Sequence, residues 1–69
     1  MTEFQLTDYD YIELNKLMKL LALVNTGGEA NMRITNQEVK VNGAIEIQKR
    51  KKLRSGDVVS FEAHQILIK

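Results

Sequence analysis

An apolar stripe near the start of the chain constrains the fold more than any other feature of the sequence. Its members recur at i, i+3, i+4 and i+7, and they are Leu14, Leu17, Met18 and Leu21. This spacing places them on one face of an α-helix, whereas Lys16 and Lys19 project elsewhere. In the preceding segment DYIE, Asp10 and Glu13 have the spacing of a capping box, so a core-facing helix is predicted to begin at Tyr11.

A chain of 69 residues holds one domain, residues 1–69, of a size at which a single core is only marginally sufficient. The composition, 43% hydrophobic and 28% charged, is typical of a folded protein rather than a disordered one. Because cysteine is absent, the sequence offers neither disulfides nor thiolate metal ligands. The acidic N-terminus and the short apolar run LLALV predict neither export nor a membrane span, so we expect a cytoplasmic protein.

A second helix, residues 27–36, is predicted from the segment TGGE. Thr26 is placed to cap its first turn, and Glu29 follows three residues later, which again matches a capping box. Gly27 and Gly28 then occupy the opening turn, where unpaired N–H groups and the positive end of the helix dipole can bind an anion and no side chain holds a phosphate away. Alternatively, the two glycines permit a tight link between the helices or a close approach of their backbones.

The remaining segments predict short strands. EFQLT, near the N-terminus, alternates apolar and polar side chains. Further on, EVKVNGAIEI carries two β-branched runs about Asn42 and Gly43, a pair typical of a type I′ hairpin turn. A two-residue loop would set Val41 opposite Ala44, whereas a three-residue loop would set it opposite Ile45 and bury more apolar surface.

The C-terminal third continues this pattern. Turns at SGD and EAHQ separate the runs VVSF and ILIK, which indicates a small, mostly antiparallel sheet. The whole chain therefore predicts an α+β fold, with two N-terminal helices packed on a small, curved, mostly antiparallel sheet. The single histidine, His64, belongs to the second turn, and Ser55 and Asp57 belong to the first, without the spacing of a catalytic or metal site. We expect no enzyme activity, no metal and no cofactor.

Charge divides the chain unevenly. Residues 1–15 contain four acidic and no basic side chains, whereas the rest of the chain contains ten basic and five acidic ones. Five of these cations fall within QKRKKLR, residues 48–54, with no acid between them. Such a run suits a polyanion, although basic runs also form solvated loops or protect the edge of a strand. Because the run has no amphipathic helix of its own, it does not indicate a membrane surface.

The order of these features resembles the S4 domain, an RNA-binding module of a ribosomal small-subunit protein, pseudouridine synthases, tyrosyl-tRNA synthetases and a heat-shock ribosome-recycling protein. The resemblance covers about residues 11–61. It rests on the Leu-rich helix, on Thr26 and Ala30 in the second helix, on VKVNG from Val39 to Gly43, and on Gly56 to Val58. The chain is most similar to the small free-standing bacterial S4-domain proteins, in which GG-x-A-K and RR-x-KKL motifs are typical.

The resemblance also implies which residues contact RNA. In the family, RNA is gripped by the first two helices, by the loop between them and by basic residues running toward the sheet. This chain departs from the pattern where Asn31 replaces a lysine, whose charge Arg33 is expected to restore in part, and where Gln48 and Arg50 alter the basic cluster. The residues carried over are Gly27, Gly28, Asn31, Arg33, Lys40, Asn42, Lys49, Lys51 and Lys52. We add Arg50 and Arg54 on charge alone and include Lys19 and Thr26 in the same candidate surface.

Aromatic residues are few and do not interleave with the basic run, which predicts phosphate contacts rather than stacking on bases. We therefore expect a monomeric, non-catalytic protein that grips structured RNA, such as a stem, junction or loop of the ribosomal or transfer class. Ribosome association is among the expectations. The alternative is a protein-interaction adaptor that presents the same basic face to an acidic partner. The sequence leaves open which RNA is bound.

Overall fold

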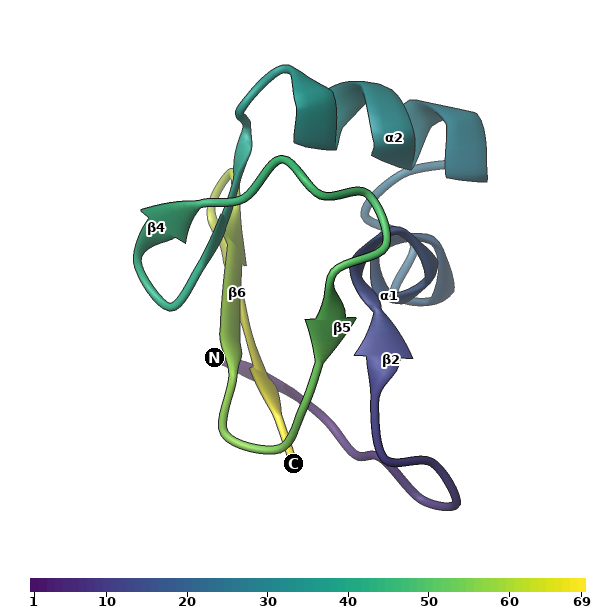
Figure 1. The fold of residues 1–69 in the computed structure, drawn as a ribbon, viewed down its shortest axis with the longest axis vertical. Helices are drawn as coiled ribbons and strands as arrows, with labels where there is room; N and C mark the ends of the chain where they lie inside the picture. The colour runs from purple at the N-terminus through teal and green to yellow at the C-terminus, as the bar shows by residue number, and fades with distance from the viewer.

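Two helices and a five-stranded sheet form two layers in the structure, a computed structural model that describes residues 1–69 (Figure 1). The helices are α1 (Leu14–Leu20) and α2 (Gly27–Thr35). They follow one another in the chain, and all the strands of the sheet except the first come after them. This arrangement confirms the predicted α+β class.

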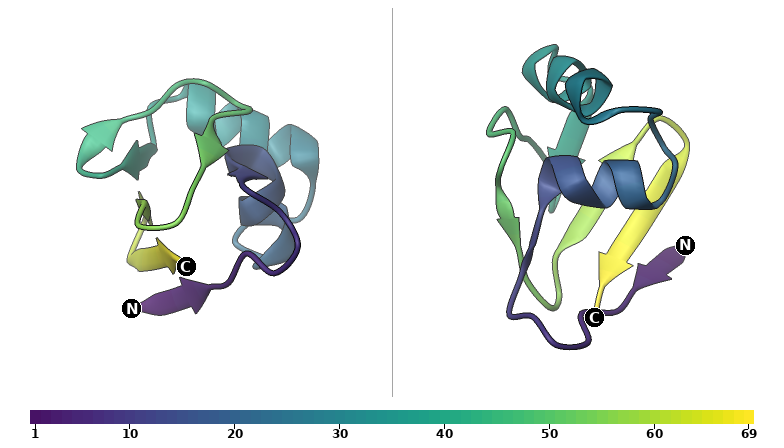
Figure 2. Two further views of the ribbon diagram at one scale, coloured as in Figure 1. Left: turned by 60° about the horizontal axis from the view of Figure 1, so that its bottom comes forward. Right: turned by 90° about the vertical axis from the view of Figure 1, so that its right-hand side faces the viewer.

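Seven short strands form one sheet and one ribbon. The sheet has the order β1-β7-β6-β3-β4 and is antiparallel except where β1 runs parallel to β7. A separate antiparallel ribbon joins β2 to β5. Figure 2 shows β1 alongside β7 at the edge of the sheet. The strands are β1 (Thr2–Phe4), β2 (Ile12–Glu13), β3 (Val39–Val41), β4 (Ala44–Ile45), β5 (Lys52–Leu53), β6 (Val58–Phe61) and β7 (His64–Ile68).

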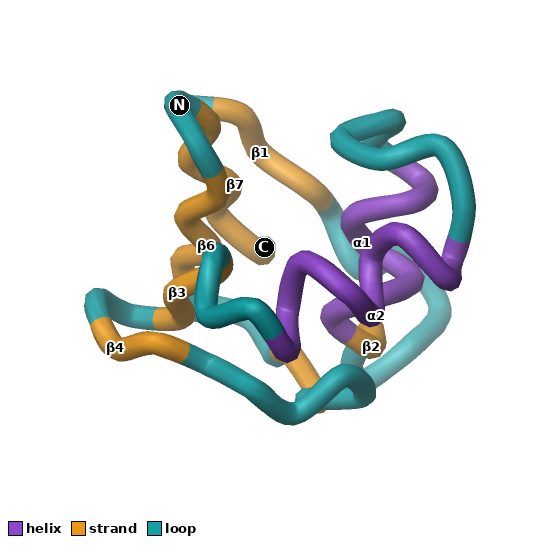
Figure 3. The backbone as a smooth tube through the Cα atoms, turned by 90° about the horizontal axis from the view of Figure 1, so that it is seen from above, coloured by secondary structure: helices purple, strands orange, loops and turns teal.

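The buried core lies between the helices and the sheet, which occupy opposite sides of the molecule when it is seen from above (Figure 3). Leu21 follows the last residue of α1 and is half-buried. On the sheet side, β3 alternates buried Val39 and Val41 with exposed Lys40. The predicted helical stripe therefore does face the core, through the completely buried side chains of Leu14, Leu17 and Met18.

The helix start predicted at Tyr11 is wrong. Strand β2 follows that residue, α1 begins at Leu14, and no side chain caps the helix. Instead, the backbone N–H groups of Leu14 and Asn15 donate to the carbonyl oxygens of Lys51 and Lys49, at 2.9 and 3.1 Å. Tertiary pairing with β5, which no local pattern reveals, therefore overrides the capping-box signal of the segment DYIE.

The second helix begins where the sequence predicts. The Thr26 hydroxyl accepts the backbone N–H of Glu29 at 3.0 Å. The Glu29 carboxylate accepts the N–H of Asn25 at 2.9 Å, one residue before the position expected for a capping box. The helix ends at Thr35, one residue earlier than predicted. These side-chain bonds fix the point at which α2 opens.

The hairpin between β3 and β4 uses the two-residue loop. Val41 pairs with Ala44, and Asn42 and Gly43 have φ values of 53° and 85°, as a type I′ turn requires. The N–H of Asn42 donates to the Val58 carbonyl at 2.8 Å, and the Asn42 side-chain oxygen accepts the Val58 N–H at 2.9 Å. These bonds to β6 hold the tight loop, although it leaves the apolar side chains of β4 exposed.

The strands at the chain ends are close to those predicted. β1 ends at Phe4, whose carbonyl accepts the N–H of Lys69 at 2.8 Å, so it is shorter than the alternating segment EFQLT. Leu6 lies beyond the strand but still packs, half-buried, against the core. The turn before β7 is shorter than the predicted EAHQ: it comprises Glu62 and Ala63, and His64, predicted to lie in the turn, is the first residue of β7.

Candidate nucleic-acid interface

A polar groove forms where three distant segments of the chain meet. Two of the segments are α1, with the residue before it, and the opening turn of α2. The third is the basic segment, which we define as residues 48–54. The groove has a volume of about 210 Å³ and contains no hydrophobic lining residue. Its lining brings together three residues predicted from the sequence, Lys19, Gly27 and Arg50, with Glu13, Asn15 and Lys16.

Backbone hydrogen bonds fix the basic segment against α1. The carbonyls of Lys49 and Lys51 that cap α1 belong to this segment. The Lys51 N–H also donates to the Gln48 carbonyl at 3.2 Å, which closes a turn within it. Lys49 and Arg50 remain exposed on that turn. Several backbone groups of the segment are thus bonded within the protein, while the side chains of Lys49 and Arg50 remain available to a ligand.

Most of the basic side chains lack an acidic partner. The structure contains ion pairs at only two cations: Arg33 contacts Glu29 and Glu38, and Lys69 contacts Glu3. Unneutralised charge gathered in one region raises the local concentration of anions. The eight cations without an ion pair are Lys16, Lys19, Lys40, Lys49, Arg50, Lys51, Lys52 and Arg54.

The two glycines of α2 do not need to be glycine for packing. A Cβ atom at Gly27 would meet no heavy atom within 4 Å, and one at Gly28 would lie 3.8 Å from the Thr26 hydroxyl. Neither glycine has a positive φ. Their backbone N–H groups have no acceptor within the protein. Neither a tight link between the helices nor a close approach of their backbones therefore explains the two glycines. An open first turn whose N–H groups can bind an anion remains a physical explanation for them.

Asn31 is turned toward the first helix. Its Oδ1 accepts a hydrogen bond from Asn15 Nδ2 at 3.0 Å, in a partly buried position. Asn15 lines the polar groove, so the structure places Asn31 beside the groove and uses it to join α1 to α2. A lysine at this position could not accept this bond.

Arg33 is engaged within the protein. Its guanidinium donates to Glu38 Oε1 at 2.8 Å, lies 3.7 Å from Glu29, and sits 5.9 Å from the centre of the Phe61 ring. The hydrogen bond and charge of Glu38 raise the pKa of Arg33. Two residues of helix correspond to about 200° of rotation, so Arg33 faces away from Asn31. The structure does not bring it to the polar groove.

Two predicted residues of the β3–β4 hairpin also lie away from the groove. Lys40 alternates with core valines and so projects from the sheet face opposite the helices. Asn42 Nδ2 donates to Asp57 Oδ1 at 3.0 Å. Burial by itself raises the pKa of Asp57. Hydrogen bonds from the Arg54 N–H and from Asn42, together with the charges of Lys51 and Arg54, lower it by more, so the pKa lies below its ordinary value. Asn42 thus acts as a connection between two turns.

Sequence reasoning missed Glu13, Asn15 and Lys16 as groove residues. Lys16 carried a usable signal, because it lies three residues before Lys19 on the polar side of the predicted helix. Asn15, four residues before Lys19, carried a similar signal, whereas Glu13 carried none, since its place depends on the pairing of β2 with β5. The carboxylate of Glu13 introduces a negative charge into an otherwise basic groove.

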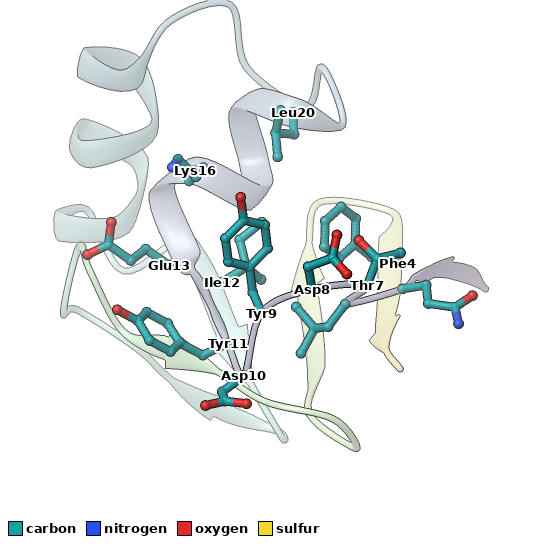
Figure 4. A pocket seen from close by; sticks show the side chains of 12 residues that line it. Phe4, Thr7, Asp8, Tyr9, Asp10, Tyr11, Ile12, Glu13, Lys16 and Leu20 are labelled. Carbon is teal, nitrogen blue, oxygen red and sulfur yellow. The ribbon is translucent and has the colours of Figure 1, made fainter.

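A larger cavity of about 760 Å³ lies beside the N-terminal segment, and Figure 4 shows its lining side chains. It shares Glu13 and Lys16 with the polar groove but contains the acidic residues Asp8 and Asp10. No cluster of three or more histidine, aspartate or glutamate side chains in the structure could hold a metal ion. Neither helix is long and apolar enough to cross a bilayer.

Residues 4–69 match the model of the S4 domain family. The chain therefore belongs to the S4 domain family, as its motifs predict. It is 37% identical over 68 residues to the protein of Escherichia coli (strain K12) named "Putative RNA-binding protein YbcJ", an alignment that covers 99% of this chain and 97% of YbcJ. The YbcJ protein of Shigella flexneri shows the same identity and coverage.

The solution structure of YbcJ from E. coli confirms the likeness in three dimensions. It aligns with a TM-score of 0.74 over 99% of this chain and 86% of that one, at 37% identity. That structure is described as revealing an αL motif involved in RNA binding. The two helices and the small sheet of this chain thus have the architecture of a small S4-domain protein of the YbcJ type.

Proposed function

We propose that this protein binds structured RNA through the polar groove and the basic segment. Membership of the S4 domain family and similarity to YbcJ, which is described as having an αL motif involved in RNA binding, support this class of ligand. In the form that the sequence favours, a single copy of the chain binds structured RNA of the ribosomal or transfer class in the cytoplasm. Association with ribosomes would follow from a ribosomal RNA ligand.

The main support for the proposal is a group of seven cations without ion pairs, three of which, Lys16, Lys19 and Arg50, line the polar groove. Five of them belong to the basic segment, and Lys16 and Lys19 belong to α1. Gly27 opens α2 at the same groove and leaves its N–H without an internal acceptor. A sugar-phosphate strand in the groove would meet cations from both sides and amide donors at the helix opening.

Contacts of this kind set affinity and orientation without reading base sequence. The protein would then distinguish one RNA from another by shape. The bonds between α1 and the basic segment fix the two sides of the groove relative to one another. We do not propose a direct contact with the RNA for three of the predicted residues. Lys40 projects elsewhere, and Asn42 and Arg33 are bonded within the protein.

We propose a binding role without a catalytic step. The polar groove presents ammonium, guanidinium and amide groups with one carboxylate, which are suited to holding phosphates. The single histidine, His64, begins β7 and is not among the residues that line the groove. No nucleophile and base are brought together there.

The test compares the parent with a variant in which Lys49, Arg50, Lys51 and Lys52 are replaced by alanine. Structured RNA is titrated at several salt concentrations. The variant is expected to bind more weakly, and its slope of log K against log salt should flatten by about 0.7 to 0.9 per lost phosphate contact. Circular dichroism confirms beforehand that the variant is folded.

Single variants provide a control of equal charge. Arg50→Ala removes a cation from the groove, whereas Lys69→Ala removes one from the pair with Glu3 at the far edge of the sheet. Only Arg50→Ala should weaken binding and flatten the salt slope. The proposal is wrong if the quadruple variant keeps the affinity and salt slope of the parent, or if an acidic polypeptide at physiological salt binds and structured RNA does not.

A further inference from the structure

Tyr11 lies within the basic surface in space, although it is far from the basic segment in the sequence. The Lys52 Nζ atom is 5.0 Å from the centre of the Tyr11 ring, and the Arg54 Cζ atom is 5.6 Å from it. Lys52 and Arg54 have no acidic partner. An aromatic ring is thus in contact with two cations that make no ion pair, although the charge of Arg54 also acts on Asp57.

The register of the β2–β5 ribbon produces this arrangement. Ile12 pairs with Leu53, and both are buried, so the neighbouring side chains of each strand face outward. Tyr11 precedes Ile12, while Lys52 and Arg54 flank Leu53. Alternation therefore places the ring and both cations on one exposed face of the ribbon.

This outward face is continuous with the polar groove. Glu13, the register partner of Lys52, also lines the groove beside Arg50. An RNA strand that leaves the groove along the ribbon therefore passes Lys52 and reaches Tyr11. The ring is 38% exposed, which leaves part of it open to a ligand.

The other exposed tyrosine of this segment does not share the arrangement. Figure 4 shows that Tyr9 extends toward α1, near Lys16 and Leu20, whereas Tyr11 extends in a different direction. No cation–aromatic contact is formed at Tyr9, although it is 76% exposed. Tyr9 therefore offers a matched control for Tyr11.

We propose that Tyr11, Lys52 and Arg54 form a site for one unstacked nucleotide of the bound RNA. The base stacks on one face of the Tyr11 ring in place of the cation that lies over that face, and the two cations, on long flexible side chains, neutralise the phosphates on either side of the base. This inference rests on the proposed function and narrows the ligand to RNA in which a nucleotide is unpaired, such as a bulge or loop next to a helix. Every base has a π-face, so the site selects an available base rather than a particular one.

The physical basis for selectivity is the state of the base before binding. Bases in a continuous duplex are already stacked and paired, so they cannot reach a tyrosine without breaking those contacts. A bulged nucleotide is already unpaired, so little free energy is lost when its base moves onto the ring. Stacking on Tyr11 therefore adds to the affinity for bulged RNA and adds nothing for a continuous duplex.

The experiment uses three RNA hairpins that differ at one position: a continuous duplex, the same duplex with one bulged 2-aminopurine, and the same bulge with an abasic residue. The parent should bind the bulged RNA roughly 5- to 150-fold more tightly than the abasic one, the range that corresponds to the free energy of stacking one base on an aromatic side chain. The fluorescence of 2-aminopurine should fall on binding. Tyr11→Leu should abolish this preference, while Tyr11→Phe and Tyr9→Leu should retain it.

Two outcomes would overturn the nucleotide site and leave phosphate binding intact. In one, the parent binds the three RNAs with equal affinity. In the other, Tyr11→Leu weakens all three equally, which would mean that the ring only positions Lys52 and Arg54. If the folded parent binds none of the three hairpins and no other structured RNA, the proposed function itself fails. Circular dichroism and a melting curve establish that each variant is folded.

Discussion

Asn42 and Asp57 hold two turns of the chain together through a single hydrogen bond of 3.0 Å between Nδ2 and Oδ1. Each side chain also accepts a hydrogen bond from a backbone N–H: Asn42 Oδ1 accepts from Val58, and Asp57 Oδ2, the second carboxylate oxygen, accepts from Arg54. The motifs VNG and GD, which are separate in the sequence, thus form one connection between the β3–β4 hairpin and the turn after the basic segment. Asp57 in this way anchors the end of the basic segment at Arg54.

Asp57 should make the stability of the protein depend on pH. Its pKa is lowered in the folded protein, so its contribution is fully present above the unfolded value of about 3.9 and is lost as the pH falls through the folded pKa. At pH 7, Asp57→Ala should lower the free energy of unfolding by about 1–2 kcal/mol, because two hydrogen bonds to a carboxylate are lost. Urea unfolding at several pH values measures the difference.

The gap between parent and Asp57→Ala should begin to narrow below about pH 4 and should narrow further as the pH falls through the folded pKa of Asp57. Asp8 is exposed and makes no side-chain hydrogen bond, so Asp8→Ala is the matched control and should leave stability unchanged. A gap that does not narrow at all between about pH 4 and about pH 2 would show that the charge of Asp57 is not what stabilises the turn.

The core position of α1 can be tested with two leucines of the same helix. Leu17 is completely buried, whereas Leu20 is 61% exposed. Leu17→Ala should destabilise the protein by about 2–5 kcal/mol, which in a domain of this size is a large part of the total stability. Leu20→Ala should change it by less than about 0.5 kcal/mol. Melting temperatures that shift equally in the two variants would mean that the buried stripe is misplaced.

The opening turn of α2 is predicted to lie against phosphate. Gly28→Glu should weaken the binding of structured RNA, because a carboxylate near a phosphate costs about 1 kcal/mol at 4 Å even in water, or roughly fivefold in affinity. The site has room for a side chain, so the fold should be retained. Gly28→Gln adds the same bulk without charge, and its affinity should fall less.

Equal losses in Gly28→Glu and Gly28→Gln would mean that bulk alone matters at this position. If both folded variants bind as the parent does, the helix opening is not a phosphate contact. Filter binding at low and physiological salt distinguishes these results, since a charge effect should shrink as salt rises.

Glu13 gives a prediction of opposite sign. It is the one carboxylate that lines the polar groove, so Glu13→Gln should increase the affinity for structured RNA, by roughly fivefold at low salt. Glu62 is exposed on the turn between β6 and β7, and Glu62→Gln makes the same change in net charge outside the groove. A gain shared by both variants would point to net charge, and no gain in Glu13→Gln would place the RNA elsewhere.

Patterns of local origin predicted the fold well. The burial of Leu17 follows from helical spacing, and the opening of α2 follows from Thr26 and Glu29, because these signals act within one or two turns. The helix start at Tyr11 was wrong because a strand pairing formed far along the chain competes with a local cap. The sequence does not determine the length of the hairpin loop for the same reason, because bonds from Asn42 to β6 stabilise the two-residue loop.

The candidate site was predictable in its charge but not in its geometry. The sequence identified Arg50 and Gly27, and the fold sets them in one groove. The engagement of Arg33 had a local signal, since Glu29 lies four residues before it on the same helix and Glu38 five residues after it. The sequence could not reveal that Tyr11 lies beside Lys52, because that contact depends on the pairing of β2 with β5. Charge and composition are properties of the sequence, whereas the availability of a charge depends on which neighbours the fold supplies.

The capping of α1 by the carbonyls of Lys49 and Lys51 couples a helix to a ligand-binding surface. Opening of the first turn of α1 breaks the bonds that hold the basic segment, and displacement of that segment exposes the amides of Leu14 and Asn15. A ligand that binds only the ordered segment therefore lowers the population of the opened state by mass action. The amide protons of Leu14 and Asn15 are bonded to the basic segment and should exchange with solvent more slowly when RNA is bound, so that the exchange of Leu14, a core residue, reports occupancy at the surface.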